Sequence, residues 1–438
     1  MRISSSRPSS RSAPSERTST PSPLRRSSTT EAARRPPEQA VAFIQAFHER
    51  LALPPKRLEE KKALMRESAS SFFRTMPALF HEDLRGPWQD ASRLLDRPAP
   101  RMLVVGDMHI GNLGTVRGPE GKAVWGLNDF DQAAPGSPEV DLTRLAVSAA
   151  LTAREAGLGA KAQAKAVEAL AKAYFHELDR LAGGGKNPGA FVSKKEAKGK
   201  VDDLIAEARD ASPEELLKKY VRTDARGQFR FQSSDTLRPV PAETQKALRA
   251  ALVPYEAGLR GAGGIARPLE VLDWVQRLDA GGSSYGLDRY YALVRAKEPG
   301  APPVMLELKE LLAPSLAQPS VPADGAHLVE NQAGFGSNFN PLTGATMVGG
   351  RAFLVRELEP EKAKLDEKAL RSEKDLLSAF TQAGVVLARA HGSTQASAAS
   401  LVKWVGEDAK DATRRLVSFA SGYADQVRAD WGAFRAVK

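Results

Sequence analysis

The sequence predicts an α+β protein with a small antiparallel sheet lobe and a larger helical lobe. Apolar residues recur at helical spacing before residue 264 and again from about residue 368, whereas β-prone runs separated by glycine- and proline-rich turns gather between them. Hydrophobic residues make up 42% of the 438-residue chain and charged residues 26%, which is typical of a globular protein with two or three domains. We therefore divide the chain into a tail (1–38), a helical lobe (39–264), a sheet lobe (265–360) and closing helices (361–438).

The first 38 residues are predicted to form a disordered basic tail. Eight arginines and two acidic residues, Glu16 and Glu31, stand in the first 37 positions, so the tail supplies six of the ten net positive charges. Its Ser, Pro and Arg composition cannot bury enough apolar surface to fold, and a solvated leader is the main interpretation. Phosphate binding and organelle targeting are the alternatives. We do not expect a nucleic acid partner, because no aromatic stacking motif accompanies the basic residues.

Several function classes are excluded by composition. The chain has no cysteine, which excludes disulfides, thiolate metal sites and a cysteine nucleophile. No run of 18 apolar residues is present, and the N-terminus lacks the apolar core of a secretory signal. We therefore expect a cytoplasmic protein without a membrane partner.

Helical patterns come first along the chain. We expect helices over 41–51 and 64–84, one with Asp141 near its start, one over 160–181, and helices from 368 to the end. Residues 195–259 are charged and interrupted by Arg226–Phe231, which indicates an inserted segment of unassigned role.

Strand patterns fall in two places. Residues 102–105 and 123–127 are expected to form two adjacent strands, each followed by polar side chains. A meander is expected in the sheet lobe, with a helix near 328–332 before its last strand; the strands cover 271–278, 290–294, 304–308 and 352–356.

The segments after the two adjacent strands carry the sharpest chemical signal. Asp107 and Asn112 show a D-x-x-x-x-N spacing in which the Asp accepts a substrate proton and the Asn binds a metal ion. Asp129, after the next strand, would supply a second oxygen ligand for Mg²⁺. Asp131 is either a further metal ligand or a hydrogen-bonded turn residue. These spacings predict a site for phosphoryl transfer.

Two neighbouring residues are interpreted as supporting. His109 is expected to orient the loop by hydrogen bonding, because the other histidines lack the paired spacing of a dinuclear hydrolase. Asp141 is expected to cap its helix and brace the same loop.

The second signal is a glycine-rich turn followed by a lysine on the third strand of the meander. Gly282, Ser283, Ser284 and Gly286 would let backbone amides approach phosphates. Lys309 would bind the α- and β-phosphates of ATP. Glu330 is the expected ion-pair partner of Lys309, with Glu307 and Glu310 as nearby alternatives.

These elements occur in reverse order compared with an ordinary kinase, in which the glycine loop and lysine precede the catalytic loop. A site is defined by geometry, so the order suggests a circularly permuted, kinase-like two-lobed fold. The apolar helical pattern over 377–390 agrees with this arrangement, because a helix would lead into the catalytic loop.

Together these motifs resemble the bacterial domain-of-unknown-function 2252 family, from about residue 71 to residue 391. The motifs are Gly106-Asp-x-His-x-x-Asn-x-Gly114, Asn128-Asp-Phe-Asp131, Asp141-Leu-x-Arg-Leu145, Gly282-Ser-x-x-Gly286, Leu308-Lys-Glu310, Val355-Arg-Glu-Leu358 and Leu387-Ala-Arg-Ala-His391. The resemblance implies a fold related to kinases and aminoglycoside phosphotransferases. It also suggests that Arg74 contacts a phosphate or carboxylate, while the acidic residue usual after Asp131 is Gln132 here.

We therefore expect an ATP- and Mg²⁺-dependent phosphotransferase acting on an unidentified hydroxyl of a small molecule or protein. A catalytically inactive kinase-like protein that binds nucleotide or a partner, and a nucleotidyl transferase, are the alternatives.

Overall fold

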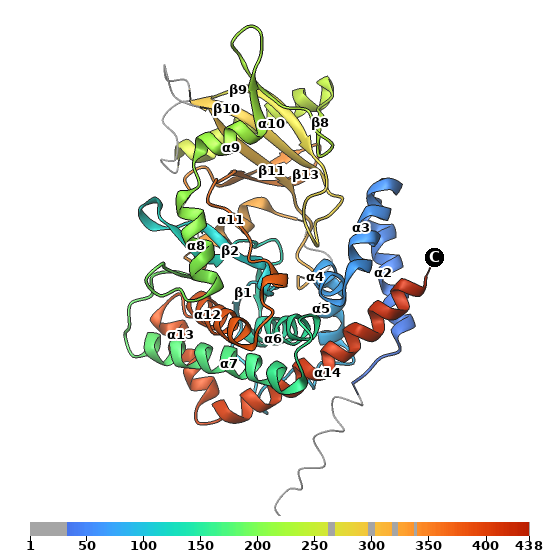
Figure 1. The fold of residues 1–438 in the computed structure, drawn as a ribbon, viewed down its shortest axis with the longest axis vertical. Coiled ribbons are helices and arrows are strands. Elements are labelled where there is room, and N and C mark those ends of the chain that lie inside the picture. Colours follow the sequence, from blue (N-terminus) through green and yellow to red (C-terminus); the bar gives the residue numbers. More distant parts are fainter. Residues whose placement is uncertain (1–32, 262–267, 297–302, 318–322, 337–339, 438) are drawn as a thin grey trace, which may run out of the picture.

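The computed structural model describes residues 33–261, 268–296, 303–317, 323–336 and 340–437. It is a mixed α+β structure with small antiparallel sheets, which confirms the predicted class. Figure 1 shows a sheet covered by one long helix at one end of the molecule and a bundle of helices at the other. In the described part of the chain, no helix is both long and apolar enough to cross a membrane.

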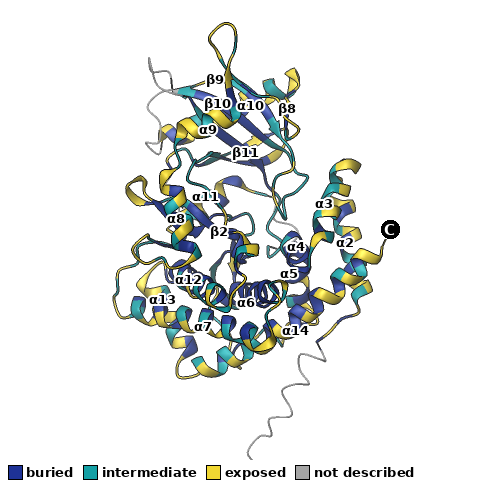
Figure 2. Cartoon of the chain, viewed as in Figure 1, coloured by how far each residue is buried: buried dark blue, intermediate teal, exposed yellow. Residues whose placement is uncertain are grey.

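The helices at the second end form what we call the helical region. It contains α2 (Pro37–Leu51), α3 (Pro55–Glu67), α4 (Ala69–Thr75), α5 (Pro77–Arg85), α6 (Pro138–Glu155), α7 (Ala160–Ala182), α12 (Glu373–His391), α13 (Gln395–Val405) and α14 (Ala409–Ala436). The single helix expected over 64–84 is split into three, because Ser68 caps α4 and Pro77 starts α5. Helix α6 is almost wholly buried at the centre (Figure 2).

A six-stranded antiparallel sheet and the helix packed on it form the sheet region. The strands lie in the order β12 (Gly344–Val348), β13 (Arg351–Glu357), β11 (Val304–Glu310), β10 (Arg289–Ala296), β9 (Leu269–Arg277) and β8 (Leu237–Pro239). The expected meander is present as β9, β10 and β11, while β12 was not expected. Helix α11 (Gly325–Gly334) lies beside β12 and β13.

The segment of unassigned role belongs partly to the sheet region. Helix α10 (Ala242–Gly261) packs its apolar face on the sheet, and Tyr255 donates a hydrogen bond to the Leu342 carbonyl at 2.7 Å. The expected boundary at 264 is therefore too late. The remainder of the segment forms α8 (Lys200–Asp210), α9 (Pro213–Tyr220) and the hairpin of β6 (Val221–Thr223) and β7 (Phe229–Phe231).

The two strands expected to be adjacent lie in different small sheets. β1 (Met102–Val104) pairs with β4 (Ala134–Gly136), whereas β3 (Ala123–Leu127) lies between β2 (Leu113–Arg117) and β5 (Phe191–Val192). The polar segments that follow β1 and β3 still meet, because the β2–β3 hairpin returns the chain to its starting point.

The end of the basic tail is part of the fold. Arg35 is buried and its guanidinium binds both Asp83 (2.6 and 2.9 Å) and Asp430 (2.9 and 2.8 Å). The expectation of a solvated tail up to residue 38 is thus wrong for its last residues, since α2 begins at Pro37. Residues 1–32 lie outside the described part.

Candidate active site

The segments after β1 and β3 are held together by backbone contacts. The Asn128 amide donates a hydrogen bond to the Asn112 carbonyl at 3.1 Å, beside the last pair of the β2–β3 ladder. Gly106 has a φ of +79°, and a Cβ there would lie 2.1 Å from the Gln132 carbonyl oxygen. Only glycine fits this close approach, so the sequence brings the Asp107 and Asp131 segments into contact.

Asp107 is buried and its carboxylate is paired with Arg144 of α6. Oδ1 of Asp107 accepts from Arg144 Nε at 2.6 Å, and the Arg144 side chain is 0% exposed. The Asn112 amide donates to the Asp107 carbonyl at 2.8 Å, which explains why the Asp and the Asn stand five residues apart. Burial raises the pKa of Asp107, and the Arg144 charge works in the opposite direction.

His109 lies beside Asp107, but the expected hydrogen bond that would orient the loop is not seen: among the described residues its buried Nδ1 has no partner. Its Nε2 lies 3.7 Å from Oδ1 of Asp107. Burial and the charges of Arg74 and Arg144 lower the pKa of His109 well below its ordinary value. The imidazole is therefore neutral near pH 7, and it contributes a hydrogen-bonding group to the site without a charge.

Lys309 of β11 reaches across to the acidic residues that follow β3. Its Nζ lies 3.3 Å from Oδ2 of Asp129 and 2.5 Å from Oδ2 of Asp131. The lysine side chain is 4% exposed, and the carboxylates of Asp129 and Asp131 are 25% and 11% exposed. Residues 180 positions apart thus form one ion cluster, which we call the Lys309 cluster.

The two carboxylates of the Lys309 cluster titrate differently. Burial works to raise the pKa of Asp129, but the charges of Lys309, Lys364 and Arg356 outweigh it and leave this pKa far below its ordinary value. Burial and the neighbouring charge of Asp129 raise the pKa of Asp131. When only one of the two carboxyl groups is ionised, the negative charge therefore lies on Asp129.

Further cations surround the Lys309 cluster, and the sequence analysis did not assign them. Arg356 is the penultimate residue of β13. Lys362 and Lys364 follow in a segment whose residue Ala363 exchanges hydrogen bonds with Thr115 of β2. Arg74, in the last turn of α4, pairs with Glu367 at 2.7 Å, and its contact with a bound phosphate or carboxylate stays a prediction. Burial lowers the pKa of Lys362 to about 7 and also lowers the pKa of Lys364, so the positive charge beside the cluster rests mainly on the arginines.

Glu330 does not pair with Lys309. It lies on the exposed side of α11, two residues after the buried Leu328, and its carboxylate is 3.7 Å from His327. Glu307 is instead the acidic residue on the same face of β11 as Lys309, because alternate residues of a strand share a face. Its buried carboxylate binds Arg289 at 2.6 Å and Arg356 at 2.8 Å.

The glycine-rich turn between β9 and β10 is anchored on α3. Lys61, which is fully buried, donates to the carbonyls of Ser283 (2.6 Å) and Tyr285 (3.3 Å). Arg57 donates to the Gly286 carbonyl at 3.0 Å and pairs with Asp288. Carbonyls of this turn therefore face the helical region. Of the predicted glycines, Gly282 has open space around it, since a Cβ there would meet no atom within 4 Å.

Asp141 braces the loop after β1, as expected, but it does not cap its helix. Its carboxylate accepts from the amides of Val105 (2.7 Å) and Gly106 (2.8 Å), and Ser137 is the N-cap of α6. His391 of α12 lies 3.0 Å from the same carboxylate and 2.8 Å from the Tyr174 hydroxyl. These buried, hydrogen-bonded side chains fix the backbone next to Asp107.

The carboxylates of the Lys309 cluster fit magnesium when substrate phosphates supply the other ligands. Within the described ranges no three His, Cys, Asp or Glu side chains are grouped to hold a metal ion. Mg²⁺ is commonly bound by one or two carboxylates together with substrate phosphates, so a full set of protein ligands is not required. Asp129 and Asp131 would supply such carboxylates, and the Asn112 amide oxygen lies on the adjoining segment.

A family of bacterial proteins matches the chain over the region that contains this site. The model of a family described as an uncharacterised protein conserved in bacteria, DUF2252, matches residues 53–437. The match covers the whole of the site, from the α3 anchor of the glycine-rich turn to the helix that carries His391. No curated protein and no solved structure matches the chain.

Proposed function

The chain belongs to the DUF2252 family of bacteria, and from the geometry of its site we propose a Mg²⁺-dependent phosphotransferase that uses ATP. The observation that carries the proposal is the contact of Lys309 Nζ with the carboxylates of Asp129 and Asp131. Phosphoryl transfer needs positioned cations and oxygen ligands for magnesium more than covalent chemistry, and both meet here.

The residues that meet at the Lys309 cluster have distinct roles in this proposal. Asp129 and Asp131, with Asn112, would hold Mg²⁺, which neutralises charge on the phosphates when it is bound. Lys309 would then turn from the carboxylates to the nucleotide phosphates, and the turn Gly282–Gly286, which lies on the side of Asp131, would cover the γ-phosphate alone. A kinase-like, circularly permuted arrangement is part of this proposal, in which Glu307, bound to Arg289 and Arg356, would take the place of Glu330 as the acidic residue near Lys309.

Asp107 is the proposed base for the acceptor hydroxyl. Arg144 binds Oδ1, and in this proposal Oδ2 accepts the proton of the acceptor hydroxyl. The raised pKa of the buried carboxyl favours proton acceptance. Arg144 and the Asn112 contact act as positioning groups, because they fix the carboxylate without touching substrate.

Incubation with γ-labelled ATP, Mg²⁺ and a panel of hydroxyl compounds tests the proposal. We expect label transfer by the wild-type protein and none by Asp107→Ala, which should still be stabilised by Mg·ATP. Normal turnover by Asp107→Ala would reject Asp107 as the base. Transfer of a nucleotidyl group would appear as a different added mass on the product.

The tight pairing of Asp107 with Arg144 favours one alternative, a nucleotide-binding protein that transfers nothing. In that case Mg·ATP would raise the melting temperature of the wild-type protein, while no acceptor would become labelled. Absence of any nucleotide-dependent stabilisation would count against both functions.

A further inference from the structure

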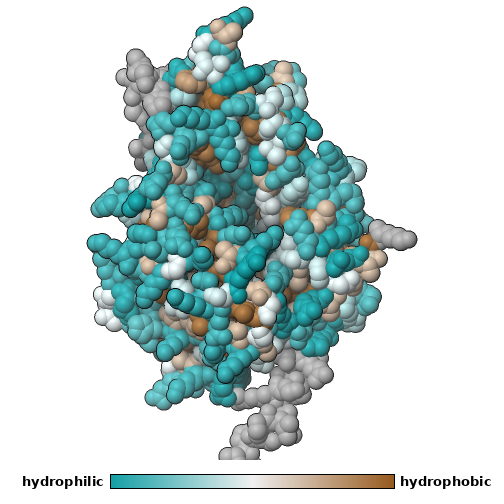
Figure 3. Space-filling view, viewed as in Figure 1, coloured by the Kyte–Doolittle hydropathy of each residue, from teal (hydrophilic) through white to brown (hydrophobic). Residues whose placement is uncertain are grey.

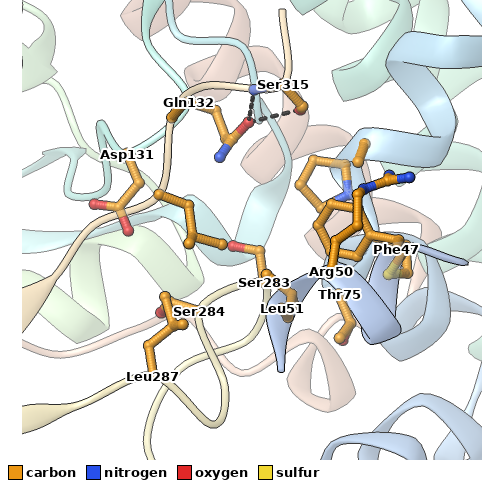
Figure 4. A pocket seen from close by; sticks show the side chains of 15 residues that line it. Phe47, Arg50, Leu51, Thr75, Asp131, Gln132, Ser283, Ser284, Leu287 and Ser315 are labelled. Atoms are coloured by element: carbon orange, nitrogen blue, oxygen red, sulfur yellow. Dashed lines mark hydrogen bonds between the residues drawn. The ribbon is translucent and has the colours of Figure 1, made fainter. Parts of the chain in front are cut away.

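A pocket adjoins the Lys309 cluster on the side of Asp131. It encloses about 200 Å³ between α2, the start of α5, the glycine-rich turn and the segment after β11. Figure 4 shows Asp131, Gln132 and Ser315 along one part of its wall, with Phe47, Arg50, Leu51 and Thr75 opposite. The space-filling view shows the surface hollowed between the sheet and helical regions (Figure 3).

The lining of this pocket, which we call the Asp131 pocket, is mainly apolar. Its apolar side chains include Phe47, Leu51, Met76, Pro77, Leu287 and Leu312. A dry cavity of ~150 Å³ is sufficient to bind benzene, so the Asp131 pocket has room for a ring-sized apolar body. A sugar would leave hydroxyl groups unpaired against this lining, at a cost in affinity.

The distribution of cations separates this pocket from the phosphates. Arg50, an exposed residue stacked near Phe47, is the one cation among the described residues that line it. Arg117, Arg356 and Lys362 instead line another pocket, together with Asn128, Glu357 and Glu359. Arg117 is paired with Glu357 and Arg356 with Glu307. Because more basic side chains lie on this side than beside Asp131, we place the triphosphate on the Asp129 side and a second substrate on the Asp131 side.

One polar group in the wall has a fixed orientation. Oε1 of Gln132 accepts from the Ser315 amide at 2.8 Å and from the Ser315 hydroxyl at 2.7 Å. The side-chain nitrogen of Gln132 consequently points away from Ser315, toward the interior of the pocket (Figure 4). An amide held in this way donates to an oxygen atom.

We propose that the Asp131 pocket binds the acceptor, a small alcohol or phenol with a ring-sized apolar body whose hydroxyl oxygen accepts from the Gln132 amide. The inference rests on the proposed phosphotransferase function. In the transfer, the acceptor oxygen forms a bond to the γ-phosphorus, the bond from that phosphorus to the β–γ bridging oxygen breaks, ADP leaves with the electron pair, and the hydroxyl proton passes to Asp107. The serine or threonine hydroxyl of a protein fits less well, because these side chains would not fill the apolar depth.

Fluorine NMR with para-trifluoromethylbenzyl alcohol as the probe tests the pocket without requiring chemistry. We expect the probe resonance to broaden with the wild-type protein and not with Ala313→Phe, which fills the pocket from its partly exposed loop. Ala317→Phe, on the same loop outside the lining, is the matched control and should bind like wild type. Equal binding by Ala313→Phe, or no binding of the alcohol to the wild-type protein, would overturn the proposal.

A second variant tests the polar contact and covers the case in which Ala313→Phe fails to fold. Gln132→Leu should weaken binding of the alcohol at least fivefold and leave binding of para-trifluoromethyltoluene, which lacks the hydroxyl, unchanged. Equal weakening of both probes would reject the Gln132 contact.

Melting temperatures of the same samples with Mg·ATP separate this inference from the proposed function. Nucleotide stabilisation without probe binding rejects the acceptor pocket alone, and probe binding without nucleotide stabilisation rejects the phosphotransferase. When both bind, a phosphorylated probe in the mass spectrum confirms that the alcohol occupies the acceptor position, whereas an unmodified probe rejects that assignment.

Discussion

The carboxylates of the site are neutralised in two different ways, one by an arginine and the other by a lysine. Asp107 is held by the guanidinium of Arg144, which also donates to the Phe73 carbonyl and stacks on the Phe73 ring with its centre 4.2 Å from the centroid. Asp129 and Asp131 share the ammonium of Lys309, and Asp129 keeps a quarter of its surface exposed. A planar guanidinium fixes geometry, whereas an ammonium on a flexible stem can be replaced by another cation. From this difference we expect the first pair to position a residue and the second to exchange its ammonium for another cation.

The largest effect is expected from Arg144→Met. The variant leaves the buried Asp107 carboxylate without its partner, and loss of one member of a buried ion pair costs ~3–5 kcal/mol of unfolding free energy. Urea denaturation measures this loss of unfolding free energy. Arg154→Met, on the same helix in a partly exposed pair with Asp425, is the control and should cost less than ~1 kcal/mol. Equal losses would show that Arg144 has no special part in the fold.

Lys309→Met should cost less, on the order of 1–3 kcal/mol, because water can reach part of Asp129. The sharper expectation concerns magnesium. With the ammonium gone, Mg²⁺ should raise the melting temperature of Lys309→Met more than that of the wild type, and should leave Arg144→Met unrescued. If Mg²⁺ acts alike on both variants, the exchangeable character of the Lys309 cluster is refuted.

A pH effect is expected at Lys61, the anchor of the glycine-rich turn. Burial lowers the pKa of Lys61 to about 7, compared with 10.5 for an ordinary lysine. Above pH 7 the unfolded chain keeps a proton that the folded protein has lost, so this residue makes unfolding less favourable as the pH rises from 7 to 10. The gap in unfolding free energy between wild type and Lys61→Met should therefore widen over that range in favour of the wild type.

Lys62→Met is the control for this measurement, because Lys62 is partly exposed and pairs with Glu59. Its difference from the wild type should stay flat with pH. A flat difference for Lys61→Met as well would mean that its ammonium stays charged in the folded state.

The smallest effect is expected from Glu330→Gln. The residue is exposed on α11, so unfolding free energy should change by no more than about 0.5 kcal/mol and Mg·ATP affinity should stay the same. Calorimetric titration provides the check. A clear loss of nucleotide binding would restore Glu330 as the partner of Lys309.

Local patterns predicted much of this architecture. The turn residues and β-prone runs were enough to predict strands β9, β10, β11 and β13. The polar segments after β1 and β3 were enough to select Asp107 and Asp129 as candidate site residues. Strand β12 was missed because Gly344–Val348 is short and begins with glycine. The pairing of β1 with β4 was missed because strand neighbours depend on distant parts of the chain.

The partners of the acidic residues were harder to predict than the acids themselves. A signal existed for Glu307, since it alternates with Lys309 on β11. The spacing of Arg144 three residues after Asp141 would have predicted the wrong pair, because Arg144 binds Asp107. Nothing local connects Lys61 with the turn 222 positions later. Long side chains choose partners through tertiary packing, which the spacing of residues in a single sequence does not reveal.

Equilibrium binding of Mn²⁺, used as a spectroscopic substitute for Mg²⁺, in the presence of ATP tests the central claim most directly. We expect the protein–ATP mixture to bind Mn²⁺ more tightly than ATP alone, with a paramagnetic resonance signal of immobilised metal that disappears in Asp129→Asn and persists in Glu330→Gln. A wild-type protein that leaves the Mn²⁺–ATP signal unchanged, or an Asp129→Asn variant that immobilises the metal equally well, would contradict the account.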